Sequence, residues 1–175
     1  MEKSYLMDII KKRRSIRKFL DKNISNELIK KLIDGARYAP SSHNTQPWEF
    51  IVVRDKEKIK HLSKTHQWSE FLANAPVVIV VCVDSEKCEM YPGNMFSVCA
   101  AVENMLLTAT SLDLATCWVY VHDPKDKKNE NHIRKILDIP EHIFVLCMIA
   151  VGYASEVPRI KKVRNLNEMI HYEKF

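Results

Sequence analysis

Apolar residues recur at helical spacing in several stretches of the chain. Ser25 is suited to cap one of these helices, whose pattern stops before Pro40. The apolar positions of this helix are Leu28, Ile29, Leu32, Ile33 and Ala36. A shorter helix that ends near the basic residues 13–18 has its apolar stripe at Leu6, Ile9 and Ile10. Further helices are predicted around Ile59 and Leu62, at about 94–112, around 132–137 and close to Tyr172.

Other stretches are short, rich in β-branched residues and typical of strands. The run 77–83, opened by Pro76, is apolar throughout, which predicts a strand buried on both faces. Residues 49–54, 116–121 and 144–151 are the other strand candidates. Helices that alternate with strands in this way predict an α+β or α/β layer structure, with a central sheet covered on both faces.

Composition limits the class of protein. A chain of 175 residues, 46% of them hydrophobic, buries one sizeable core, so we expect residues 1–175 to form a single domain. The longest apolar run, 75–83, is too short to cross a bilayer, and residues 1–8 lack the apolar stretch of a secretory signal. Five cysteines without a C-x-x-C pair, and histidines without a zinc spacing, predict reduced thiols and no structural metal. We therefore expect a cytoplasmic protein.

The net charge of +5 raises the question of nucleic-acid binding. The excess of 27 basic over 22 acidic residues is mild, and it gathers in two clusters, at 11–18 and at 159–164. Neither aromatic interleaving nor a helix-turn-helix pattern accompanies these clusters. A nucleic-acid-binding domain without a cofactor is therefore an alternative that the pattern does not favour.

Glycine usage excludes the common backbone cradles for phosphate. The 3 glycines stand at 35, 93 and 152, so neither G-x-G-x-x-G nor a Walker A loop occurs in the chain. A nucleotide phosphate would have to be held by side chains, and the run Arg13-Arg14-Ser15-Ile16-Arg17 supplies guanidiniums and a hydroxyl in a compact segment. The alternative is a solvated basic helix end, favoured by the helix dipole.

A polar loop between Pro40 and Pro47 is the second candidate for ligand binding. Its asparagine and glutamine amides present both donors and acceptors, which suits the edge of a heterocycle such as the flavin pyrimidine. The alternative is a surface loop whose side chains cap neighbouring backbone. Trp48, directly before a strand, is interpreted as a structural anchor of this loop.

Taken together, R-R-S-x-R at 13–17 and A-P-S-S-x-N-x-Q-P-W at 39–48 resemble the amino-terminal signature of the nitroreductase family of FMN enzymes. The likeness continues through the long helix, 115–119, 151–153 and 162–164, and covers nearly the whole chain. It implies an α+β fold, a nitroreductase-like three-layer α/β/α sandwich with a mixed, mainly antiparallel central sheet.

The resemblance also implies a homodimer with FMN at its interface. The groups implied to hold the phosphate and the ribityl chain are Arg13, Arg14, Ser15, Arg17, Lys162 and Arg164. The loop implied to reach the cofactor from the other subunit comprises Pro40, Ser41, Ser42 and Asn44, with Gln46 as a secondary candidate. The backbone implied to pass near the isoalloxazine ring belongs to Cys117, Trp118 and Val119.

The implied activity is ping-pong transfer of reducing equivalents from NADH or NADPH, through FMN, to a small electrophilic acceptor such as a nitroaromatic or a quinone. No side chain is nominated as catalytic, because the cofactor carries the chemistry. The alternatives are an FMN carrier or sensor with little turnover, and a specialised flavin reductase or dehalogenase on the same scaffold. Tyr120 stands where many relatives have glycine, and 113–115 replaces a glycine-rich turn, changes that would narrow the acceptor pocket.

Overall fold

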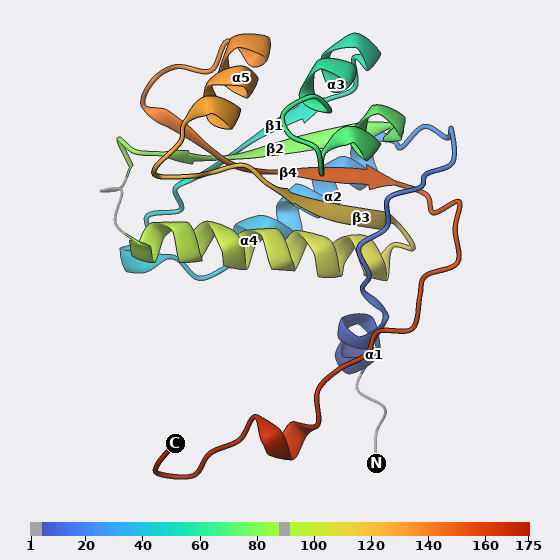
Figure 1. Ribbon diagram of the computed structural model, residues 1–175, viewed down its shortest axis with the longest axis vertical. Helices are drawn as coiled ribbons and strands as arrows, with labels where there is room; N and C mark the ends of the chain where they lie inside the picture. The colour runs from blue at the N-terminus through green and yellow to red at the C-terminus, as the bar shows by residue number, and fades with distance from the viewer. Residues whose placement is uncertain (1–4, 88–91) are drawn as a thin grey trace.

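The computed structural model describes residues 5–87 and 92–175 (Figure 1). Its helices are α1 (Tyr5–Lys12), α2 (Asn26–Arg37), α3 (Lys56–Leu62), α4 (Pro92–Ser111) and α5 (Lys128–Leu137). Its strands are β1 (Trp48–Val53), β2 (Val77–Asp84), β3 (Ala115–Tyr120) and β4 (Ile143–Gly152). Short 3-10 turns are η1 (Ser42–Asn44), η2 (Glu70–Asn74) and η3 (Leu166–Glu168).

The strands form one four-stranded sheet in the order β1-β2-β4-β3. All pairs of neighbouring strands are antiparallel, and β2 lies against β4 along its whole length with one bulge between Val81 and Cys82. Every residue of β2 is buried, so the predicted strand with two covered faces is confirmed. Side chains of Val77 and Ile79 pack on one face, and those of Val78 and Val80 pack on the other, as strand alternation requires.

Helices cover both faces of the sheet. Figure 1 shows α2 and α4 on one face and α3 and α5 on the other, which confirms the expected α+β fold with three layers. Ser25 caps α2 as predicted, since its side chain accepts a hydrogen bond from Leu28 N–H. A Cβ on Gly35 would lie 2.2 Å from Thr108 Oγ1, so glycine permits the close approach of α2 to α4.

The segment after α1 runs along the free edge of β3. Ser15 forms a parallel bridge with Thr116, and Ile16 N–H donates to Thr116 O at 2.9 Å. Ile16 is buried at this position. The bridge thereby fixes the side chains on either side of Ile16 next to β3.

The final segment, 157–175, is exposed along its whole length. The helix predicted near Tyr172 is reduced to the 3-10 turn η3, and Figure 1 shows this tail leading away from the layers. Its apolar side chains include Val157, Ile160 and Val163, which are 91%, 92% and 75% exposed. The tail therefore contributes nothing to the core of its own chain.

The four cysteines in the described part of the chain are free, and Cys88 lies outside it. Burial raises the pKa of Cys82 to about 12 and the pKa of Cys147 well above its ordinary value. Both thiols therefore stay protonated. Across residues 5–87 and 92–175, no helix is long and apolar enough to span a membrane.

Candidate functional site

A pocket of about 760 Å³ lies at the free edge of β3. Four segments line it: Arg17 after α1, residues of the turn 66–71, the strand residues 117–120, and Asn129 of α5. This volume lies in the range of roughly 300–1,000 Å³ that is usual for small-molecule and cofactor sites. The lining combines aromatic rings with amides and charged groups.

The basic segment and β3 meet at this pocket. Arg17 lines it together with Cys117, Trp118 and Val119. Burial raises the pKa of the Cys117 thiol, while the charge of Arg17, a hydrogen bond with Ser15 and the charge of Arg13 act in the opposite direction. Arg13, Ser15 and Arg17, which are predicted to hold a phosphate, therefore all act on the thiol of Cys117, which is predicted to lie near a flavin ring.

Arg13 and Arg17 have different neighbours. The Arg13 side chain is 19% exposed, and its Nε lies 3.8 Å from Glu103 Oε1 on α4. The Arg17 guanidinium lies over the Phe71 ring, 5.7 Å from its centroid. Arg13 is thus positioned by an ion pair with the helix layer, and Arg17 by an aromatic wall of the pocket.

The Arg14 guanidinium binds backbone carbonyls away from the pocket. Its Nη1 donates to Lys11 O and Arg13 O, at 2.5 and 2.8 Å, and its Nε donates to Arg159 O at 3.0 Å. These bonds commit the guanidinium to the backbone of α1 and the tail, outside the lining of the pocket.

The polar loop 40–46 lies elsewhere in the same chain. It leads into β1, the edge strand opposite β3, and three strand spacings separate the two edges by about 14 Å. Ser42 N–H donates to Ser97 Oγ at 3.3 Å, which ties the loop to the first turns of α4. The loop residues do not contribute to the lining of the pocket, and those with exposed side chains are Pro40, Ser42, His43, Asn44 and Gln46.

The loop backbone is also strained. His43, Asn44 and Gln46 have φ values of 50°, 54° and 48°, in the left-handed region that disfavours side chains with a Cβ. Ser41 Oγ accepts a hydrogen bond from Gln46 N–H at 3.0 Å and helps to hold this shape. Such strain is typical of segments whose conformation serves a ligand.

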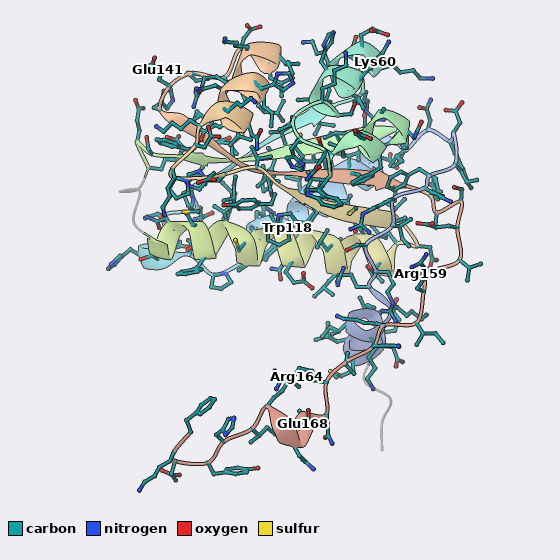
Figure 2. All side chains as sticks on the ribbon, in the orientation of Figure 1. Lys60, Trp118, Glu141, Arg159, Arg164 and Glu168 are labelled. Carbon is teal, nitrogen blue, oxygen red and sulfur yellow. The ribbon has the colours of Figure 1, made fainter. Side chains whose placement is uncertain are left out.

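Lys162 and Arg164 lie on the exposed tail. Figure 2 shows Trp118 within the layered part of the molecule, and Arg164 and Glu168 on the tail that leads away from it. Arg164 donates to Glu168 O at 3.3 Å, a contact within the tail itself. The structure therefore does not bring these two cations to the pocket of their own chain.

The turn 66–71 and Asn129 line the pocket and were missed by sequence reasoning. The turn has neither a helical nor an alternating apolar pattern, so it gave no signal of structure. A histidine, a glutamine and a tryptophan in succession, just before a buried strand, were the available hint. Their placement depends on a contact with the distant end of β3, which no local pattern records.

Comparisons with known proteins agree with this architecture. The family model described as "Nitroreductase family" matches residues 10–68 and 60–153. A relative from Methanothermobacter thermautotrophicus, whose assigned name is NADH dehydrogenase/NAD(P)H nitroreductase, is 37% identical over 176 aligned positions, covering 100% of this chain and 90% of the relative.

Solved structures show the same arrangement. A Parabacteroides distasonis protein with that assigned name superposes with a TM-score of 0.91 at 32% identity, covering 99% of this chain and 100% of the other. An FMN-dependent nitroreductase from Clostridium difficile superposes with a TM-score of 0.84 at 35% identity, covering 97% and 99% of the two chains. With its fold, its pocket and its sequence in agreement, this chain belongs to the nitroreductase family.

Proposed function

We propose that this chain is an FMN-dependent oxidoreductase that passes reducing equivalents from NADH or NADPH to a small electrophilic acceptor. The observation that carries the proposal is a pocket of about 760 Å³ that Arg17 lines together with residues 117–120 of β3, with Ser15 and Arg13 near the Cys117 thiol. FMN-dependent and NAD(P)H-dependent relatives of similar length support it.

The residues at the pocket fit the chemistry of FMN. The Arg17 guanidinium in the lining suits a phosphate, with Arg13 and Ser15 beside it in the sequence, and the Gln67 and Asn129 amides offer donors and acceptors to a heterocycle edge. We assign Arg13, Ser15 and Arg17 to the phosphate end, and the 117–119 backbone to the ring. Arg14 is left out of this set because its guanidinium is engaged by backbone carbonyls.

When bound, FMN supplies the hydride chemistry that no side chain provides. The protein binds the ring, orients it and limits the access of water. The Gln67 and Asn129 amides, at the wall of the pocket, would donate hydrogen bonds to negative charge on a bound ring. We nominate no side chain as general acid or base.

We further propose a cytoplasmic homodimer in which the partner completes the site. The loop 40–46, Lys162 and Arg164 are exposed and lie away from the pocket of their own chain. A tail with exposed Val157, Ile160 and Val163 buries apolar surface only against another chain. The partner's loop and tail would then supply the amides and cations assigned to the cofactor.

The test is the visible absorbance of purified protein and of an Arg13→Ala/Arg17→Ala variant. We expect yellow protein, and at least about a 100-fold loss of FMN affinity in the variant, since each charge-assisted hydrogen bond is worth roughly 1.5–3 kcal/mol. Arg37→Ala/Arg54→Ala is the matched control, because those guanidiniums bind Asp34 and Asn26 outside the pocket. Colourless protein that ignores added FMN, or full FMN occupancy in the Arg13/Arg17 variant, would contradict the assignment.

A further inference from the structure

A second cavity, of about 430 Å³, lies where β1 leads into α3 and η2 leads into β2 (Figure 1). Its walls are the segment 19–23, the turn after β1, Ile59 of α3, and residues 73–76. Among the described residues, it shares none with the lining of the pocket at the edge of β3. Its volume is also in the range that is usual for small-molecule sites. The residues assigned to the cofactor therefore do not account for this cavity.

The floor of this second cavity is apolar and fixed in shape. Ile59 is 1% exposed, and the Phe19 ring packs on the backbone of Gly152, where a Cβ would lie 2.5 Å from Phe19 Cδ1. The backbone on both sides of Phe19 is hydrogen-bonded to residues 153 and 155, at 2.8 and 3.0 Å. The floor is thus held in place without a ligand, which reduces the ordering that binding would require.

The charges of the lining favour an anion with a single charge. Arg54 and Lys56 are its cations, and among the residues 5–87 and 92–175 that line the cavity, Asp21 is the only acid. Asp55, between the two cations in sequence, is engaged elsewhere, because its carboxylate accepts a hydrogen bond from Lys58 N–H at 2.8 Å and caps α3. Two cations and one carboxylate complement a monoanion better than a neutral molecule or a dianion.

The polar side chains of the lining can still take a ligand. In the part of the chain that the structure describes, the side chains of Lys56, Asn23 and Asn74 have no hydrogen-bond or ion-pair partner. Arg54 differs, since its Nη2 donates to Asn26 Oδ1 at 3.0 Å, which fixes the position of its charge. An ammonium group and two amides supply donors for both oxygens of a carboxylate.

We propose that this second cavity is a binding site for a small organic monocarboxylate with a compact apolar body. The body lies on the floor formed by Phe19 and Ile59, and the carboxylate accepts hydrogen bonds from Lys56. Apolar burial supplies affinity for the body, and the net positive charge of the lining selects the anion. The site is separate from the proposed function, and binding there does not require FMN.

The first test uses two probes of the same shape, naphthalene-2-carboxylate and its neutral counterpart naphthalene-2-carboxamide. Their dissociation constants are measured by calorimetry, and we expect the carboxylate to bind at least about fivefold more tightly. Lys56→Gln should weaken carboxylate binding about three- to tenfold and change carboxamide binding by less than about twofold. Lys58→Gln is the matched control, because Lys58 is exposed on the same helix but outside the lining of the cavity.

The second test locates the probes. Ala73 lines the cavity with an exposed side chain, so Ala73→Phe would fill part of the space without changing the core. We expect this variant to bind both probes at least about tenfold more weakly. Saturation with FMN should change the affinity of the parent for the carboxylate by less than about twofold, because the cofactor is assigned to the pocket at β3.

Several results would overturn this second site. Carboxylate that does not bind at millimolar concentration, or that FMN displaces, excludes it, and equal affinity for the two probes excludes selection of an anion. Parent affinity in both Lys56→Gln and Ala73→Phe places the probe elsewhere. If Ala73→Phe does not fold, Ala73→Leu takes its place. A protein that binds no FMN contradicts the proposed function instead, and the Lys56 and Ala73 variants still decide whether the second cavity binds a carboxylate.

Discussion

The basic segment 13–17 and the polar loop 40–46 carry the two halves of the predicted cofactor site, yet they lie at opposite edges of the sheet. The basic segment is fixed to β3 by the bridge between Ser15 and Thr116, and its Arg17 lines a pocket in the same chain. The loop is fixed to α4 and β1, on the far edge of the sheet, with its polar side chains exposed.

This difference shows which part of the predicted site a single chain brings together. The basic segment reaches the pocket because its backbone pairs with β3 of the same chain. The loop has three residues in the left-handed region and keeps its polar side chains exposed, away from the pocket of its own chain. This arrangement supports the proposed division of the site between two subunits.

The largest expected effect comes from mixing two defective chains. One carries Arg13→Ala/Arg17→Ala, and the other carries Ser42→Ala/Asn44→Gly, where glycine keeps the left-handed backbone while it removes the amide. In a heterodimer, one site would hold both defects and the other neither. Equal mixing after unfolding and refolding should therefore restore about a quarter of the FMN sites of the parent.

The separate variants are the control for this mixing experiment, and bound flavin per chain is the measured quantity. If the mixture binds no more FMN than the two variants alone, both halves act within one chain and the division between subunits is wrong.

A smaller effect is expected from Glu103→Gln. The Glu103 carboxylate pairs with Arg13 at 3.8 Å and competes with a phosphate for the guanidinium. A partly exposed ion pair contributes roughly 0.2–1 kcal/mol, so its loss should tighten FMN binding about 1.4- to fivefold, measured by quenching of flavin fluorescence. Asp34→Asn, which breaks the pair with Arg37 far from the pocket, should leave FMN affinity unchanged. Weaker binding in Glu103→Gln would place the phosphate away from Arg13.

The smallest effect concerns the turn that leads from α4 into β3. Asp113 has φ 54°, which glycine adopts without strain. Asp113→Gly should raise the free energy of unfolding by about 0.5–1 kcal/mol, and Asp113→Ala should lower it, as measured by urea denaturation. FMN affinity should stay the same in both, because the turn lies outside the pocket lining. A change in affinity would mean that the turn, and not β3 alone, shapes the site.

Pattern and composition predicted the scaffold well. The predicted strand 77–83 corresponds to β2, and the predicted helix at about 94–112 corresponds to α4. Both were predictable because an element that is buried on both sides has an almost continuous run of apolar residues. The N-cap at Ser25 was predictable from its local chemistry. These features depend on residues close together in sequence.

The rim of the pocket could not be predicted in the same way. His66 and Tyr120, which share a hydrogen bond, are 54 residues apart in the sequence. A single hydrogen bond of this kind produces no periodic pattern of apolar and polar residues. The two guanidiniums of Arg13 and Arg14 are adjacent in sequence, and only their tertiary partners, Glu103 for one and backbone carbonyls for the other, separate their roles. The predicted sharing of the loop and the tail between subunits stays a prediction.

The pairing of Ile16 with Thr116 has a second consequence, for solubility. β3 is an outer strand, and open outer strands recruit strands from other chains. By covering part of that margin, the segment 13–19 shields the molecule against self-association. Cleavage of the chain within this segment would therefore disrupt the residues assigned to the cofactor and also expose the edge of β3. We expect the cleaved protein to aggregate instead of remaining in solution without its cofactor.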